Sequence, residues 1–141
     1  MMKIIHDYPP IWEEVNMAGM RPNPNNIAFT YCGAIYVPSG RQLDDHVVAH
    51  EEVHGKQQGE GEDGARAWWS RYIIDPYFRI EQEAEAYARQ YDFICVKIKD
   101  RNQRHKVLTD LGRMLAGPTY GSVVNQSDAC AMIKNKAKTK K

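Results

Sequence analysis

Long hydrophobic runs are missing from this sequence. The longest clear apolar stretches, residues 27–29 and 34–37, fall far short of the ~20 residues that a membrane-spanning helix needs. Near the N-terminus, Asp7 and the Pro9-Pro10 pair come before any apolar segment of signal-peptide length can develop. We therefore expect a cytoplasmic protein with no membrane partner.

Cysteine is also scarce, with only Cys32, Cys95 and Cys130 in the chain. An odd number at wide spacing fits neither a disulfide framework nor a Cys-x-x-Cys zinc ribbon. No neighbouring residue would depress a thiol pKa. We expect three reduced thiols that behave as small, partly buried apolar side chains.

The composition is that of one globular domain, with 141 residues of which 43% are hydrophobic and 26% charged. Residues 1–96 contain 8 Lys/Arg against 15 Asp/Glu, whereas residues 97–141 contain 11 against 3, so the two parts should attract each other. The lysine-rich residues 134–141 include no aromatic residue to stack on a base. We interpret 1–133 as a single domain and 134–141 as a basic disordered tail, a reading favoured over a nucleic-acid partner.

Five segments carry helical signals: residues 9–19, 46–58, 77–99, 103–116 and 127–134. The apolar runs 27–31 and 34–37 flank Cys32-Gly33 and predict a β-hairpin, since the glycine can take the positive φ of a tight turn. The acidic, glycine-punctuated residues 59–64 predict a mobile loop, and 65–74 a helical turn followed by an ordered loop. Within that stretch, Trp68 and Trp69 should line the core or a cleft, and in helix 103–116 Met114 should face the core.

His50-Glu51-x-x-His54 is the most informative motif. Helix positions four apart share a face, about 6 Å from one another, so His50 and His54 can aim imidazole nitrogens at one zinc ion. Glu51 is offset by about 100° and can flank the open side of the metal as a general base. Zinc polarises a scissile carbonyl and lowers the pKa of water towards ~7, so the motif predicts hydrolysis of peptide bonds. His46 also lies four residues before His50, but no glutamate follows it, and we expect a surface residue there.

A catalytic zinc needs a third protein ligand, for which helix 77–99 offers three glutamates. Glu81 shares a face with Ala84 and Ala88, whose small side chains would allow close approach to the histidine helix. We predict Glu81 as the ligand and Glu83 as part of a solvated face. If the register differs, Glu83 or Glu85 takes the metal.

Glu85 lies on the same face as Glu81, four residues later. A carboxylate at this position can accept the outer N–H of His50 or His54 and so hold the ring in place. We predict this role for Glu85. The residue that stabilises the oxyanion is not defined, and His105, Tyr120 and Tyr31 are the candidates.

The His50-Glu51-x-x-His54 motif and the later Glu81-x-x-Ala84-Glu85 pattern together resemble the gluzincin branch of zinc metallopeptidases, over about residues 27–90. The resemblance is to short, single-domain metallopeptidases of bacteriophage and bacterial genomes. It implies a mostly helical minimal zincin of the α+β class, with a small β-hairpin or sheet before the motif helix. It also implies that the 26–37 hairpin pairs main chain to main chain with an extended peptide substrate.

Two other functions remain open from the sequence. One is a non-catalytic protein in which zinc ties elements together and another surface binds a partner. The other is a zinc protease associated with nucleic acid, which only the charge asymmetry indicates. Glu51 separates the peptidase from a structural zinc site, because a structural site has no use for a general base.

Overall fold

The computed structural model describes residues 2–20 and 22–139. The strands of these residues form one three-stranded sheet. Its strands lie in the order β1 (Lys3–Ile5), β3 (Ala34–Tyr36) and β2 (Phe29–Tyr31), and β2 is antiparallel to β3. The two residues between these strands, Cys32 and Gly33, have φ of 48° and 79°, as a type I′ turn requires. The predicted hairpin is confirmed. Cys32 is exposed rather than partly buried, because it lies at the tip of this turn.

The strand β1 (Lys3–Ile5) was not indicated by the sequence. It runs parallel to β3, with Ile4 opposite Ile35, and the Val37 N–H donates to the Ile5 carbonyl at 2.8 Å. A strand of three residues is too short to show an alternating pattern. With β1 on the other side of β3, the strand β2 is left at an edge of the sheet.

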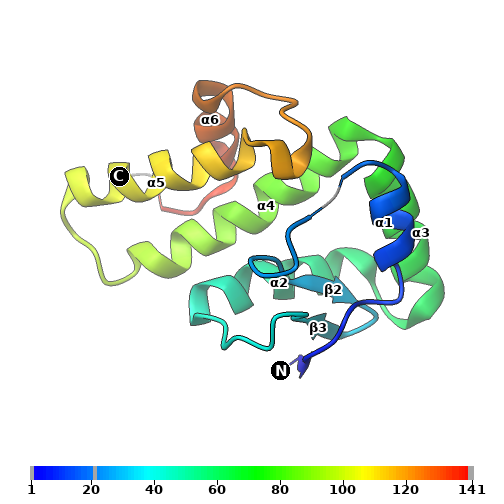
Figure 1. Cartoon of the computed structure of the whole chain (residues 1–141). Coiled ribbons are helices and arrows are strands. Elements are labelled where there is room, and N and C mark those ends of the chain that lie inside the picture. Colours follow the sequence, from blue (N-terminus) through cyan, green and yellow to red (C-terminus); the bar gives the residue numbers. More distant parts are fainter. Residues whose placement is uncertain (1, 21, 140–141) are drawn as a thin grey trace. The chain divides into compact units, whose positions relative to one another are not determined.

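Three helices accompany the sheet: α1 (Trp12–Met17), α2 (Asp45–Gln58) and α3 (Gly61–Ile74). The first two lie where the sequence predicts helices. Helix α2 ends at Gly59, whose φ of 75° suits glycine. Figure 1 shows α2 beside the strands, and residues of α2 contact β2.

The prediction of a mobile loop at 59–64 was wrong, because α3 begins at Gly61. Glu62 and Asp63 lie in its first turn, where negative charge is favourable near the positive end of the helix dipole. A Cβ atom on Gly64 would collide with the Gln58 carbonyl oxygen, so this glycine permits the close corner between α2 and α3. Trp68 and Trp69 on α3 are both buried, in agreement with the prediction.

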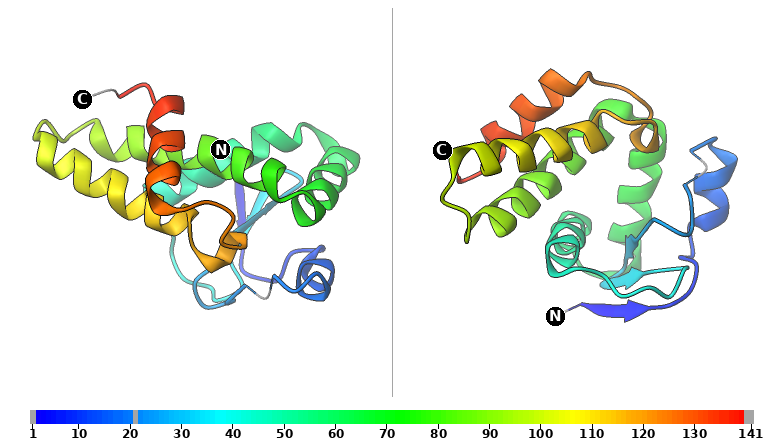
Figure 2. Two further views of the ribbon diagram at one scale, coloured as in Figure 1. Left: turned by 90° about the horizontal axis from the view of Figure 1, so that it is seen from above. Right: turned by 60° about the vertical axis from the view of Figure 1, so that its left-hand side comes forward.

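Within the described residues 76–139, the second part of the chain contains helices joined by loops and no strand. It contains α4 (Pro76–Cys95), α5 (Arg101–Leu115), a 3-10 turn η1 (Pro118–Tyr120) and α6 (Gln126–Lys136), and the three α-helices pack against one another (Figures 1 and 2). Asp100 caps α5 and Asn125 caps α6 through their side chains. The shared core consists of apolar residues from all three helices, among them Ile80, Ala84, Tyr87, Leu108, Leu111, Leu115 and Ile133. Met114, predicted to face this core, is 53% exposed.

The basic segment at the C-terminal end is ordered over residues 134–139, which corrects the predicted disordered tail. Helix α6 extends to Lys136, and Ala137 is buried. The Asp92 carboxylate accepts hydrogen bonds from the backbone N–H groups of Lys138 (2.9 Å) and Thr139 (2.8 Å). Residues 140 and 141 lie outside the described residues.

The chain divides into two compact units, residues 1–75 and 76–141. The first holds the sheet with α1, α2 and α3, and the second holds α4, α5 and α6. A compact unit is not by itself an independent domain, so the single domain 1–133 stays a prediction. The chain is mostly helical with one small sheet, as the predicted α+β class requires. None of the helices described is long and apolar enough to cross a bilayer.

Candidate metal centre

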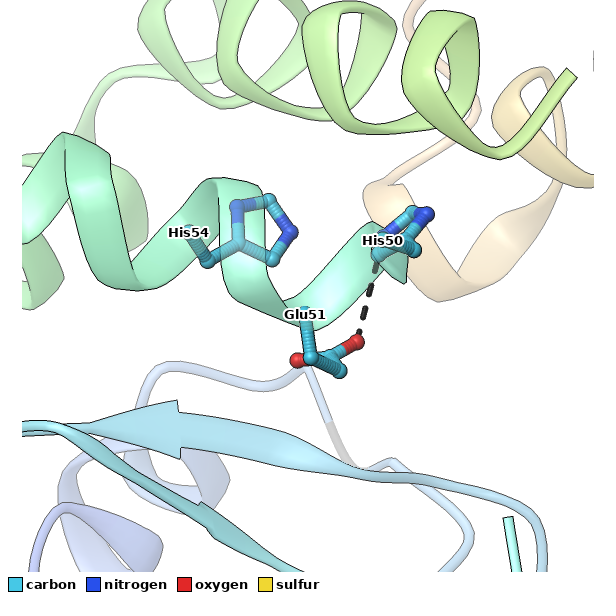
Figure 3. A group of neighbouring side chains, drawn as sticks. All are labelled: His50, Glu51 and His54. Atoms are coloured by element: carbon cyan, nitrogen blue, oxygen red, sulfur yellow. Dashed lines mark ion pairs between the residues drawn. The ribbon is translucent and has the colours of Figure 1, made fainter. Parts of the chain in front are cut away.

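His50 and His54 lie on one face of α2, one turn apart, as their spacing predicts (Figure 3). Their ring centroids are 5.0 Å apart and the ring planes are inclined at 79°. Only 5% of His50 and 4% of His54 is exposed. Two surface histidines on a polar helix would be solvated, so this burial favours a shared role for the two rings.

The orientation of the His54 ring is fixed by Gln57, whose side-chain oxygen lies 2.8 Å from Nδ1 of His54. An amide oxygen can only accept, so Nδ1 carries the proton in this contact and Nε2 keeps its lone pair. This is the arrangement that a metal-binding histidine needs. The Trp68 ring also contacts the His54 ring, and the two ring centroids are 5.1 Å apart.

Glu51 extends from α2 toward the strands, on a different side of the helix from the rings (Figure 3). Its carboxylate is 7% exposed, and Oε2 lies 3.8 Å from Nε2 of His50, too far for a direct hydrogen bond. Oε1 accepts a hydrogen bond from the Thr30 hydroxyl at 2.9 Å, and the same hydroxyl lies 3.0 Å from the Glu51 carbonyl oxygen. One carboxylate oxygen is therefore held by β2 while the other faces His50.

His50, Glu51 and His54 are the one group of three or more His, Cys, Asp or Glu side chains within residues 2–20 and 22–139 that lies close enough to hold a metal ion. Their ligand atoms are all within 4.8 Å of one another. Two buried imidazoles beside a buried carboxylate are a donor set that suits zinc. His50 and His54 could thus serve as two metal ligands, with the Glu51 carboxylate beside them.

The free edge of β2 is partly occupied by side chains of the same unit. The Thr30 carbonyl accepts hydrogen bonds from Gln58 Nε2 at 2.7 Å and from Trp69 Nε1 at 2.9 Å. Gln58 also accepts from the Cys32 N–H through its Oε1 at 3.2 Å. Because Thr30 faces Ile35 in the register, its main-chain groups point away from β3, and Gln58 takes the place that a neighbouring strand would have.

The three glutamates of α4 lie in the second unit, and their environments differ from the expected ones. Glu81 is exposed and pairs with Lys136 of α6 at 3.0 Å, while Ala84 on the same face is packed in the core with α5 and α6. Glu83, predicted to be solvated, is only 4% exposed. Glu85 is exposed. The choice of the third ligand among them stays a prediction.

The other candidate residues are held by different contacts. Nδ1 of His54 contacts Gln57, and the role of Glu85 at His50 or His54 stays a prediction. The Tyr31 hydroxyl donates to Glu62 at 3.0 Å, and burial together with this bond raises the Tyr31 pKa to about 12. The Tyr120 hydroxyl lies 2.7 Å from that of Tyr87 in the second unit.

The two remaining histidines of interest are outside the group. His105 is exposed on α5, and His46 lies 3.6 Å from Asp44 at the start of α2. Their roles as an oxyanion partner and as a surface residue stay predictions.

Sequence reasoning missed Thr30 and Gln57. Gln57 follows His54 by three residues, so helical spacing alone could have suggested it as the partner of the ring. Thr30 precedes Glu51 by 21 residues and meets it only because β2 and α2 pack together. No local pattern carries that signal.

Comparisons with protein-family models, with curated proteins and with solved structures found no match. A functional proposal for this chain therefore depends on the residues of the site. The decisive features are the two buried rings and the tethered carboxylate next to them.

Proposed function

We propose that this protein is a zinc-dependent metallopeptidase that hydrolyses peptide bonds with Glu51 as the general base. The observation that carries the proposal is the state of Glu51. Its carboxylate is buried, held at one oxygen by Thr30, and directed at the other toward His50. Burying a carboxylate is costly, so a purely structural pair of histidines gives no reason for one here.

His50 and His54 would supply two of the zinc ligands. The third is proposed to come from α4, where two observations point to different residues. The resemblance to gluzincins selects Glu81, whereas Glu83 is the buried carboxylate of the three. Glu85 would then hold a ligand in place or serve as the alternative.

The residues of the site have distinct tasks in this proposal. When bound, zinc would polarise the scissile carbonyl and make water acidic enough to be deprotonated near neutral pH. Glu51 takes a proton from the attacking water and delivers it to the leaving amine, so no covalent enzyme intermediate forms. Gln57 keeps the His54 ring in the tautomer that leaves Nε2 available.

The proposed substrate is a peptide in extended form that pairs with the edge strand β2. The Thr30 carbonyl and the Cys32 N–H are already engaged by Gln58 and Trp69. Main-chain pairing would therefore use the part of the edge that precedes the Thr30 carbonyl. A bound peptide could therefore not continue its main-chain pairing along β2 as far as the turn at Cys32-Gly33.

The experiment compares Glu51→Gln with a matched control on the same helix, Glu52→Gln. Wild-type protein loaded with zinc is incubated with a mixture of fluorescence-quenched peptides, with and without a chelator. General-base catalysis contributes about 10²–10⁴-fold, so Glu51→Gln should lose at least a hundredfold in rate while it keeps its zinc. Glu52→Gln should remain within about twofold of wild type. Undiminished cleavage by Glu51→Gln contradicts the mechanism, and zinc binding without any cleavage by wild type favours the non-catalytic alternative.

A further inference from the structure

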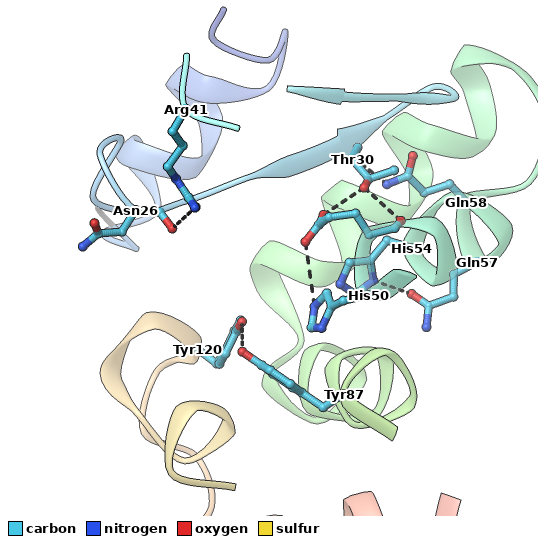
Figure 4. A network of polar contacts seen from close by, with 10 residues as sticks. Asn26, Thr30, Arg41, His50, His54, Gln57, Gln58, Tyr87 and Tyr120 are labelled. Atoms are coloured by element: carbon cyan, nitrogen blue, oxygen red, sulfur yellow. Dashed lines mark hydrogen bonds and ion pairs between the residues drawn. The ribbon is translucent and has the colours of Figure 1, made fainter. Parts of the chain in front are cut away.

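Thr30 makes an unusual set of contacts for the middle residue of a short strand. Its side chain is almost completely buried, with 1% of the residue exposed. Both acceptors within reach of its hydroxyl belong to one residue, the carboxylate oxygen Oε1 and the carbonyl oxygen of Glu51. The hydroxyl thus connects β2 directly to the helix that carries the two histidines (Figure 4).

A buried hydroxyl costs free energy unless it is hydrogen-bonded. Valine has nearly the same shape and an equal preference for strands, so packing alone would be served without the hydroxyl. Glu51 is the partner that accounts for the oxygen atom at this position. The bond is also charge-assisted when Glu51 is ionised, and such bonds are shorter and stronger than neutral ones.

Thr30 is itself well anchored. It lies opposite Ile35 in the hairpin register, and its carbonyl, which points away from β3, accepts from both Gln58 and Trp69. Its side chain is β-branched, so χ1 has few accessible rotamers. A hydroxyl on such a support holds its acceptor more rigidly than one on a loop would.

We propose that Thr30 is a positioning residue for the general base. It binds Oε1 of Glu51, so that Oε2 is the oxygen that stays directed toward Nε2 of His50, 3.8 Å away. The inference rests on the proposed peptidase function. It adds that the base is aligned from the sheet, by a side chain that binds neither metal nor substrate.

The test uses Thr30→Val, which removes the hydroxyl and keeps the shape, and Thr30→Ser, which keeps the hydroxyl and loses a methyl group. A misplacement of about 1 Å can cost about a hundredfold in rate, so Thr30→Val should lower kcat by about 10 to 100-fold. KM and zinc content should stay at the wild-type values, because neither depends on the base. Thr30→Ser should recover most of the kcat. Loss of kcat in Thr30→Ser as large as in Thr30→Val would show that packing, not the hydroxyl, is responsible, and would overturn the proposal.

A second measurement does not depend on activity. Crystal structures of the zinc-loaded Thr30→Val and Thr30→Ser proteins should show the Glu51 carboxylate displaced in the first and unchanged in the second. An undisplaced carboxylate in Thr30→Val overturns the positioning role, even when the protein cleaves peptides. If wild type cleaves no peptide, the peptidase proposal fails, whereas the two crystal structures still decide what holds Glu51.

Discussion

Nδ1 of His54 lies 2.8 Å from the side-chain oxygen of Gln57, three residues further along α2. This contact places the ring proton on Nδ1 and leaves the lone pair on Nε2, the nitrogen proposed to bind the ion. Helix α2 thus supplies both a proposed ligand and the residue that orients it.

Removal of Gln57 should weaken metal binding. Partners of this kind typically contribute 10 to 100-fold to metal affinity, so Gln57→Ala should raise the zinc Kd by about that factor. The Kd is measured by competition with a chelator of known affinity. Gln42→Ala, at an exposed position before α2, is the control and should leave the Kd unchanged. Equal affinities of wild type and Gln57→Ala would show that the contact does not orient the ring.

The third ligand can be found by comparing glutamates of α4. We expect a large loss of zinc affinity for only one of Glu81→Ala, Glu83→Ala and Glu85→Ala, because one carboxylate completes the set. Lys136→Ala is the control, because it breaks the ion pair with Glu81 and leaves the carboxylate in place. If Glu81 is only a surface residue, this variant should bind zinc with wild-type affinity. Unchanged zinc affinity in the Glu81, Glu83 and Glu85 variants would place the third ligand elsewhere.

Tyr31 should make the folded state sensitive to high pH. Burial and the bond to Glu62 raise its pKa to about 12, so the folded protein keeps the phenol proton while the unfolded chain loses it near the usual value of 10. This contribution is fully present below pH 10 and is lost as the pH rises to about 12. The free energy of unfolding in urea should fall more steeply over this window in wild type than in Tyr31→Phe. The exposed Tyr77→Phe is the control, and a wild-type slope no steeper than that of Tyr31→Phe would contradict the raised pKa.

Gly112 should be required for packing in the second unit. A Cβ atom there would collide with Sγ of Cys130, so α5 and α6 approach each other closely at this point. Overpacking of a core costs about 1–3 kcal/mol, and we expect a loss of this size in the free energy of unfolding for Gly112→Ala. Cys130→Ala removes the colliding sulfur, and the double variant should recover part of the loss. Strict additivity of the two changes would mean that this contact is not the cause.

The parts of the fold that the sequence predicts well are those with local signals. The hairpin follows from two apolar runs around Cys32-Gly33, and α2 from its acidic start and its terminal Gly59. The prediction for 59–64 is wrong because three glycines in six residues are more typical of a loop than of a helix. Gly64 instead lies within α3, where the close approach of the Gln58 carbonyl leaves no room for a side chain.

The candidate site divides in the same way. His50, Glu51 and His54 are brought together by helical spacing, so the five residues from 50 to 54 are enough to predict them. The pairing of Glu81 with Lys136 depends on how α4 packs against α6, and the burial of Glu83 was not revealed by periodicity either. Thr30 belongs to the same class, since its contact with Glu51 joins a strand to a helix.

The central claim is that His50 and His54 together bind one divalent ion. The most direct measurement is the zinc content of purified protein, determined for wild type, His50→Ala, His54→Ala and the control His46→Ala. His46 is also four residues from His50, so it tests whether spacing alone is sufficient. Close to one zinc per chain is expected for wild type and His46→Ala, and loss of the metal for the other two. Zinc retained by both His50→Ala and His54→Ala would contradict the central claim.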